Sequence, residues 1–245
     1  MKIVRAGYQI LNMDLDDPKC ASDIYKAIEK AGRTCYKSEA KITDESAEKF
    51  VRGLRNNHHD AMLEHAIMTV KFINDRGVSH EMVRHRPCSF AQESTRYCNY
   101  SDDRFGHEIT VIRPCFFDEI SDERAAEIIR LYEENLKSGI YETFTSRERQ
   151  YIDWYYACIC ADKSYFEMLE DGATPQEARS VLPNSLKTEI VITANMREWR
   201  HILNLRAAGT TGKPHPQMLE VMVPLLNELR MKLPALFDDI KPLEE

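Results

Sequence analysis

The sequence predicts a single domain of the α+β class, and three observations lead to this prediction. First, 245 residues with 43% hydrophobic content can build one sizeable core, so we expect one domain spanning residues 1–245. Second, segments with the alternation typical of strands are interspersed with segments of helical periodicity. Third, the glycines do not form a dinucleotide-binding fingerprint, which argues against a Rossmann fold.

Four elements are predicted before residue 80. Apolar residues one helical turn apart predict a helix that Gly32 should end, and the alternation of Ala66, Met68, Val70 and Phe72 predicts a half-buried strand that Gly77 should break. The predicted elements are a strand over residues 2–11, helices over residues 22–31 and 44–57, and a strand over residues 65–74.

A short helix over residues 80–86 should follow, with Ser79 as its N-cap. Pro87 should end it, because the residue before a proline is driven out of the α region. From Pro87 to Tyr100 neither period is clear, so we expect a loop, which is where ligand contacts usually lie.

The second half of the chain should supply a scaffold of helices and one more strand. Residues 121–171 are predicted to form scaffold helices, and Thr174–Glu177 reads as a capping box that opens a helix carrying Arg179. Residues 186–194 are rich in β-branched side chains and predict a strand.

Asn195 should then cap a helix with Arg197 and His201 on its polar face and Trp199, Ile202 and Leu203 toward the core. After a loop over residues 208–214, a final helix should bury an apolar stripe formed by Met218, Val221, Met222, Leu225 and Leu229.

Charge and cysteine content narrow the range of functions. The formal net charge of −7 argues against a protein that binds nucleic acid through a basic surface. Seven cysteines, an odd number without paired Cys-x-x-Cys spacing, indicate reduced thiols and no structural zinc. The N-terminus lacks an apolar signal core and no 18-residue apolar run exists, so we expect a cytoplasmic protein without membrane contact.

Residues 84–97 are the most distinctive segment of this acidic chain. They contain Arg84, His85, Arg86 and Arg96, with no lysine and a single acid, Glu93. Arginine presents a planar fork of donors suited to phosphate oxygens, whereas a merely solvated surface would mix charges evenly and use more lysine. The segment therefore predicts a site for an anionic ligand.

The same segment carries a family resemblance. Arg84-His85-Arg86, followed after seven residues by Ser94-Thr95-Arg96-Tyr97, resembles the signature of the flavin-dependent thymidylate synthases, the alternative enzymes that methylate dUMP. The resemblance covers residues 59–100 and 175–217 well. It implies a fold of the thymidylate synthase-complementing type, with a central, mainly antiparallel sheet flanked by helices.

The resemblance also implies the reaction and its partners. The expected activity is reductive methylation of dUMP to dTMP, with 5,10-methylenetetrahydrofolate as carbon donor, NADPH as reductant and FAD as the cofactor between them. Tetrahydrofolate would be released. The expected assembly is a homotetramer whose active sites are shared between subunits.

The catalytic prediction follows from the chemistry of uracil. Carbon C5 of the ring is a poor nucleophile until charge is pushed into the ring, which a cysteine attacking C6 can do. Cys88 and Cys115 each follow a proline, but neither is followed by the histidine of the conventional synthase motif. The alternative is a fixed cation against N3–H and O2 of the ring, and Arg206, at the end of Leu203-Asn204-Leu205-Arg206, is the predicted catalytic residue.

The residue types and the resemblance together assign binding roles, with no metal ligand among them. Ser94, Arg96 and the amides near Thr95, joined by Arg179 from another subunit, should cradle the nucleotide phosphate. The full set expected to bind dUMP is Glu81, Met82, Val83, Arg84, Gln92, Glu93, Ser94, Thr95, Arg96, Arg179 and Arg206. The set expected to bind FAD is His59 through Ala61, Arg84, His85, Arg86, Gln92, Asn195, Met196, Arg197 and His201.

Departures from the commonest family pattern and two rival readings remain open. Ala91 with Gln92, Glu81, Gln176 and Ala208 differ from the usual residues. The histidines and acids His58, His59, Asp60, Glu64, His65 and His80 would suit an HD-type metal phosphohydrolase, if further ligands joined them. Alternatively, the arginines could serve a nucleotide-binding protein without catalysis.

Overall fold

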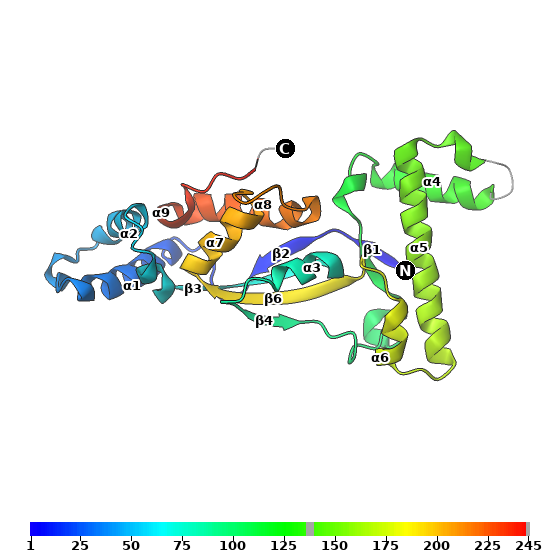
Figure 1. The fold of residues 1–245 in the computed structure, drawn as a ribbon, viewed down its shortest axis with the longest axis horizontal. Coiled ribbons are helices and arrows are strands. Elements are labelled where there is room, and N and C mark those ends of the chain that lie inside the picture. Colours follow the sequence, from blue (N-terminus) through cyan, green and yellow to red (C-terminus); the bar gives the residue numbers. More distant parts are fainter. Residues whose placement is uncertain (136–139, 244–245) are drawn as a thin grey trace. The chain divides into compact units, whose positions relative to one another are not determined.

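The structure, a computed structural model, describes residues 1–135 and 140–243, and its helices and strands confirm the predicted α+β class (Figure 1). The chain divides into two compact units, each built from separate segments. The first unit comprises Met1–Ala6, Asn74–Ser79 and Glu93–Thr188, and the second comprises Gly7–Ile73, His80–Gln92 and Glu189–Glu245. No helix in the described part of the chain is both long and apolar enough to cross a membrane.

The first unit is built around a long helix, α5, and a two-stranded parallel pair. Strand β1 pairs with β5 so that Ile3 lies opposite Val111. Helix α4 begins at an N-cap on Ser121, and α5 begins at a capping box between Thr145 and Glu148. The elements of this unit are β1 (Lys2–Val4), η3 (Asp103–Phe105), β5 (Thr110–Ile112), η4 (Cys115–Phe117), α4 (Asp122–Glu134), η5 (Ile140–Thr143), α5 (Ser146–Glu170), α6 (Pro175–Ala178) and η6 (Arg179–Val181).

Aromatic packing joins the helices of the first unit. The core of α4 and α5 centres on Phe117, Ile128, Tyr151 and Ile152, with ring centroids of Phe117 and Tyr151 5.4 Å apart. The prediction of scaffold helices over residues 121–171 is confirmed by α4 and α5. Residues 136–139 of that prediction lie outside the described residues.

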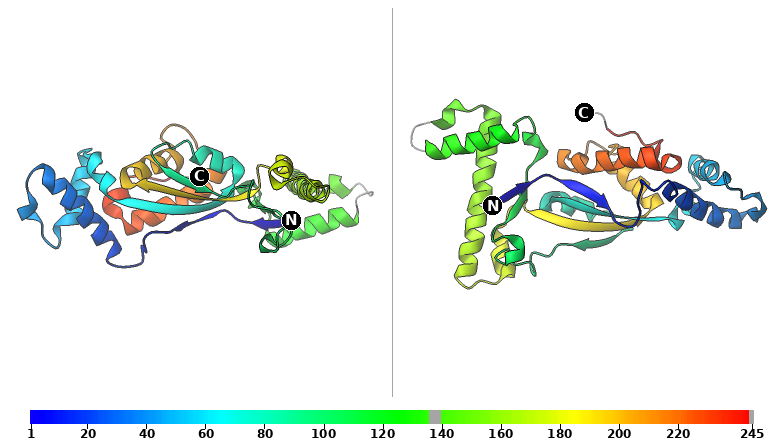
Figure 2. Two further views of the ribbon diagram at one scale, coloured as in Figure 1. Left: turned by 90° about the horizontal axis from the view of Figure 1, so that it is seen from below. Right: turned by 180° about the vertical axis from the view of Figure 1, so that it is seen from behind.

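The second unit holds most of a four-stranded sheet with the order β2-β3-β6-β4. β2 pairs antiparallel with β3, and β4 pairs antiparallel with β6, as the resemblance implied. Helices α7 and α8 contact each other and lie over one face of this sheet (Figure 2). The strands are β2 (Gly7–Ile10), β3 (Ile67–Asp75), β4 (Ser89–Gln92) and β6 (Lys187–Asn195), and the helices are α1 (Cys20–Cys35), η1 (Glu39–Lys41), α2 (Ser46–Asn56), η2 (Asp60–His65), α7 (Met196–Arg206), α8 (Pro216–Lys232) and α9 (Pro234–Phe237). Helix α3 (Arg76–Met82) has residues in both units.

Alternation along the strands sets the core of the second unit. Met68, Val70 and Phe72 of β3 are fully buried, as the sequence pattern predicted. The apolar stripe predicted on the final helix is also buried, from Met218 to Leu229. The interior of this unit is therefore a sheet face covered by the apolar sides of two helices.

Trp199 anchors α7 to the sheet. Its side chain is fully buried, its ring centroid lies 6.3 Å from that of Phe72, and its indole Nε1 donates to the carbonyl of Met68 at 2.9 Å. The helix begins where predicted, because the side chain of Asn195 accepts from the amide of Glu198 at 2.9 Å. These contacts fix where the polar side chains of α7 point.

Several boundaries differ from the predictions. The strand expected over residues 2–11 is two strands, β1 and β2, which pair with different partners. The loop expected from Pro87 to Tyr100 contains β4, which pairs at the edge of the sheet. Four residues without β-branched side chains give little sequence signal, so only the pairing with β6 reveals this strand.

The start of α3 and two glycines were also predicted wrongly. The helix begins at Arg76 and ends at Met82, with Asp75 Oδ1 accepting from the amide of Val78 at 2.7 Å, so Ser79 is not its cap. Gly77 lies inside this helix and does not end the strand. Arg179 follows α6 and opens η6, although the capping box at Thr174 is present.

Gly32 does not end a helix either, because α1 runs through it to Cys35. A Cβ atom on Gly32 would lie 2.8 Å from Cε1 of Phe50, whose ring is covered by the guanidinium of Arg33 at 4.3 Å. The glycine is therefore required by the close approach of α1 and α2.

We expect Gly32→Ala to lower the free energy of unfolding by about 1 kcal/mol net, since overpacking costs about 1–3 kcal/mol and alanine returns about 1 kcal/mol of helix propensity. Gly53→Ala is the matched control, because Gly53 lies inside α2 with nothing within 4 Å of an added Cβ, and it should stabilise the protein. Urea unfolding of both variants measures the difference. Equal effects of the two substitutions would contradict the packing assigned to Gly32.

Candidate functional site

The guanidinium of Arg206 is held by three acceptors in the second unit. Its Nε donates to Nε2 of His85 at 3.1 Å, and its terminal nitrogens donate to the carboxylate of Glu81 at 3.0 Å and to the carbonyl of Glu81 at 3.4 Å. Arg206 is the last residue of α7, and Glu81 lies in the last turn of α3. Since a guanidinium has five N–H donors, two remain available to a ligand.

His85 is a buried, neutral partner of this arginine. Burial, helped by electrostatic interaction with Arg206 and His201, lowers its pKa to about 4. The imidazole is therefore uncharged at neutral pH and able to accept a hydrogen bond through Nε2. The side chain that the resemblance assigned to FAD thus contacts the predicted catalytic residue directly.

Glu198 and His201 lie on the other side of the His85 ring. Oε1 of Glu198 is 4.0 Å from Nδ1 of His85, and burial raises the pKa of Glu198 above its usual range. The ring of His201 meets that of His85 edge-on, with centroids 6.1 Å apart. Glu198 was missed by the sequence analysis, although its place three residues before His201 on a polar helix face was a usable signal.

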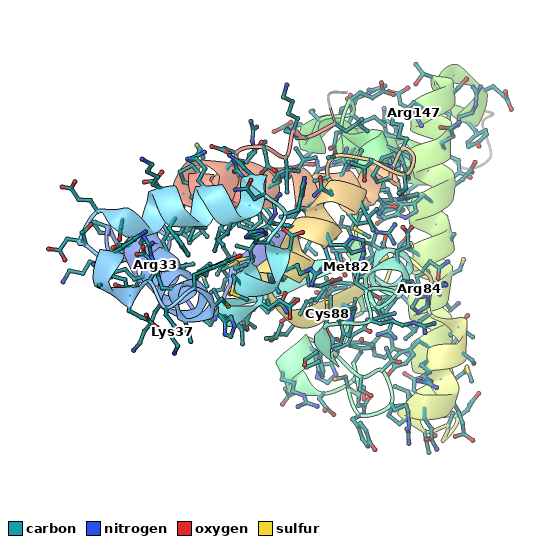
Figure 3. All side chains as sticks on the ribbon, turned by 60° about the vertical axis from the view of Figure 1, so that its left-hand side comes forward. Arg33, Lys37, Met82, Arg84, Cys88 and Arg147 are labelled. Carbon is teal, nitrogen blue, oxygen red and sulfur yellow. The ribbon has the colours of Figure 1, made fainter. Side chains whose placement is uncertain are left out.

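The Arg84-His85-Arg86 triplet leaves two arginines exposed. Arg84 and Arg86 lie in the turn after α3, and neither forms an ion pair with any residue that the structure describes. Met82, by contrast, is buried in the core at 1% exposure, whereas Val83 is exposed. Met82, Arg84 and Cys88 are labelled in Figure 3, around the segment that leads from α3 to β4.

Cys88 lacks the character of a nucleophile. Burial, helped by the nearby carboxylate of Glu198, raises the pKa of its thiol to about 11. The thiol is therefore protonated at neutral pH, in agreement with the prediction that cysteine does not attack the substrate.

Gln92, which was assigned to both dUMP and FAD, lies at the end of β4.

A cavity of about 290 Å³ beside η2 gathers several of the residues assigned to FAD. Its lining includes His59, Ala61, Met62 and Arg197. Arg197 is exposed at its edge and pairs with Glu64, with the two charged atoms 2.6 Å apart. Asn195 and Met196 lie at the start of α7, where Met196 is buried and Asn195 serves as the N-cap.

In the first unit, the expected phosphate residues gather at a turn over Ser94, Thr95 and Arg96. Oγ of Ser94 accepts from the amide of Arg96 at 3.3 Å, and a terminal nitrogen of Arg179 donates to Oγ1 of Thr95 at 3.5 Å. Arg179 was expected to reach this turn from another subunit, but the structure places it there within the same chain. Arg96 and Arg179 are exposed, and neither is ion-paired within the described residues. Two cations and two hydroxyls beside one turn form an arrangement suited to phosphate.

Glu93, which precedes this turn, already has partners. Its carboxylate accepts from the hydroxyl of Tyr100 at 3.0 Å and pairs with Lys187 at 3.0 Å. Glu93 therefore ties the start of the turn to Tyr100 and Lys187. Tyr100 and Lys187 were not anticipated, because no local pattern links them to Glu93 and only the fold brings them together.

The residues of the HD-type reading are not assembled into a metal site. Within the described part of the chain, the single group of three or more potential metal ligands with atoms all within 4.8 Å is His85, Glu198 and His201. His58, His59, Asp60, Glu64, His65 and His80 do not belong to it. The structure therefore does not favour a metal phosphohydrolase built on these residues.

Solved structures with a similar fold exist. A crystal structure of the UMP/dUMP methylase PolB from Streptomyces cacaoi, bound with 5-Br dUMP, superposes with a TM-score of 0.71 and 23% identity, covering 97% of this chain and 96% of that one. The 5-Br UMP form of the same enzyme gives a TM-score of 0.69 and 21% identity. At this identity the likeness establishes the fold.

Comparison of amino-acid sequences shows the family of this chain as well as its fold. The flavin-dependent thymidylate synthase of Corynebacterium aurimucosum is 31% identical over 230 residues, which cover 93% of this chain and 84% of the relative. The protein of the same name from Mycobacterium marinum is 30% identical over 217 residues, covering 87% and 78%. The model of the thymidylate synthase complementing protein family matches residues 20–235, and the chain belongs to that family, as the Arg84-His85-Arg86 segment predicted.

Proposed function

We propose that this chain is a flavin-dependent thymidylate synthase. In the proposed reaction, dUMP, 5,10-methylenetetrahydrofolate, NADPH and a proton yield dTMP, tetrahydrofolate and NADP⁺. The observation that carries the proposal is the match of residues 20–235 to the family, whose relatives of about 30% identity bear that name. The local geometry of two residue clusters supports it.

The turn over Ser94, Thr95 and Arg96 is proposed to bind the phosphate of dUMP. Arg96 and Arg179 form no ion pair within the described residues, and each can donate two hydrogen bonds to phosphate oxygens. The hydroxyls of Ser94 and Thr95 add neutral donors. Glu93, which directly precedes the turn, is held by Tyr100 and Lys187 and so fixes the position at which the turn begins.

Arg206 is proposed to polarise the uracil ring. Its two free N–H donors can meet O2 and N3, where negative charge accumulates as C5 becomes nucleophilic. Since its other donors are engaged by His85 and Glu81, the guanidinium is oriented before the substrate arrives.

The residues assigned to FAD suit a dinucleotide. A cavity lined by Ala61 and Arg197, exposed Arg84 and Arg86, and the N-terminus of α7 offer an apolar wall, cations and backbone donors. When bound, a flavin supplies the two-electron hydride chemistry that forming a methyl group requires. Arg197 contacts Glu64 through one terminal nitrogen, so its other N–H groups can donate to a ligand there.

The remaining features are proposed from the family resemblance. Residues 1–245 act as one synthase domain, four copies of which form a homotetramer that shares its active sites. NADPH and the folate are co-substrates, and the cytoplasm is the proposed location. Nucleic acid and membranes are not partners in this proposal.

Arg206→Ala should lower the rate of dTMP formation about 10²- to 10³-fold, the usual cost of losing a donor at a site of developing charge, and should retain FAD. The assay is dTMP formed from dUMP, methylenetetrahydrofolate and NADPH, with bound flavin measured by absorbance. Arg200→Ala is the matched control, because Arg200 lies on the same helix and pairs with Asp239.

Two results would count against these assignments. Wild-type protein that forms no dTMP with all substrates present would refute the proposed function. If the Arg206→Ala variant lost bound flavin to the same extent as it lost turnover, the catalytic role of this residue would be refuted.

Arg96→Ala should weaken dUMP binding by roughly 10- to 100-fold, because one charge-assisted contact to phosphate is lost, and should leave FAD affinity unchanged. Arg104→Ala provides the control, since Arg104 is an exposed arginine of the same unit that pairs with Asp102 at 3.3 Å. Titration calorimetry with dUMP measures both variants. Unchanged dUMP affinity in Arg96→Ala would refute the phosphate assignment.

A further inference from the structure

The orientation of Arg206 depends on the protonation of one ring nitrogen. Arginine has donors only, so Nε2 of His85 can accept from Nε of Arg206, at 3.1 Å, only if Nε2 carries no proton. In a neutral imidazole the proton must then be on Nδ1. The Arg206 contact therefore selects one of the two tautomers of His85.

The group that faces Nδ1 is Glu198. Its Oε1 lies 4.0 Å from Nδ1, is buried, and has no hydrogen-bond partner among the residues that the structure describes. A buried carboxylate oxygen without a partner is costly. The Nδ1–H of His85, at 4.0 Å, is beyond hydrogen-bond distance but is a donor that a small shift brings to this oxygen, and His201 is the other group with a ring nitrogen nearby. Glu198 thus favours the tautomer that Arg206 requires.

We propose that Glu198 and His85 are positioning residues that orient the guanidinium of Arg206 through a relay from the Glu198 carboxylate to His85 Nδ1–H and from His85 Nε2 to Arg206 Nε–H. The catalytic consequence rests on the function proposed for Arg206. Glu81 completes the arrangement by accepting from both terminal nitrogens. The logic is that of a carboxylate that fixes a histidine tautomer so that the histidine can hold a third group.

A metal ion on the same residues is the competing reading, since His85, Glu198 and His201 bring potential ligand atoms within 4.8 Å of one another. A metal on Nδ1 of neutral His85 would place the proton on Nε2, which would then meet the Arg206 Nε–H donor for donor. It would also place a second cation beside the guanidinium. The observed contact therefore favours the relay.

The direct test is the tautomer of His85 in the full-length protein, read from ¹⁵N-histidine NMR at neutral pH and assigned by loss of the signal in His85→Gln. The relay predicts an Nδ1–H, Nε2-unprotonated ring. A ring protonated on Nε2, alone or together with Nδ1, would overturn it, and so would stoichiometric bound metal in elemental analysis of the same sample.

Turnover of variants tests the consequence. His85→Gln places an amide oxygen near the position of Nε2 and should retain most of kcat, whereas His85→Ala should lower kcat roughly 10- to 100-fold at saturating dUMP, the loss expected for one hydrogen bond to a charged group. Glu198→Gln should give a mixture of tautomers and an intermediate rate. His65→Gln, an exposed histidine at the end of η2, is the control.

The values of kcat are compared at equal flavin content, so that a loss of bound FAD is not mistaken for a misoriented Arg206. His85→Ala turning over like the wild type, or His85→Gln falling as far as His85→Ala, would overturn the relay. Wild-type protein with the Nδ1–H tautomer but no dTMP synthesis would refute the proposed function and leave the tautomer relay supported.

Discussion

The burial of Trp199 is the constraint on which the candidate site depends. Its indole packs against Phe72 and donates to the carbonyl of Met68, both in β3, an inner strand of the sheet. Because a helix side chain points in a direction set by its position along the turn, fixing Trp199 fixes the polar residues of α7 as well. Glu198, His201 and Arg206 therefore hold their places because one tryptophan fills the core beneath them, and burial of a side chain of this size contributes about 2–3 kcal/mol or more to stability.

Charge distribution explains how an acidic chain can bind anions. The net charge is −7, and many arginines are neutralised by neighbouring acids, as Arg200 is by Asp239 and Arg55 by Asp238. Arg84, Arg86, Arg96 and Arg179 are exposed without such partners in the described residues. Local cations that no acid neutralises are free to meet phosphate, and the negative charge of the whole chain discourages non-specific contact with nucleic acid.

Patterns that act within one element were readable from the sequence. The alternation of Met68, Val70 and Phe72, the cap at Asn195 and the apolar stripe of the last helix are all present as predicted. So is the family, because the Arg84-His85-Arg86 segment is specific. The departure Glu81 now has a local explanation, since its carboxylate pairs with Arg206.

What the sequence did not reveal depends on partners far along the chain. Strand β4 exists through pairing with β6, and Gly32 is required by Phe50 of the neighbouring helix. The role of Glu198 could be inferred only from the fold, which places it beside His85, more than 100 positions away in the sequence. Tertiary contacts of this kind override local propensity. For this reason the helix boundaries, and supporting residues such as Glu198, Tyr100 and Lys187, were the parts least predictable from the sequence.

The most direct test of the proposed function is the visible spectrum of the purified protein as NADPH is added without oxygen, with and without dUMP. A flavin enzyme that acts on dUMP should show flavin absorbance that bleaches on addition of NADPH, and faster when dUMP is present. A colourless protein that neither takes up added FAD nor oxidises NADPH would contradict the account and leave a phosphate-binding protein without this chemistry.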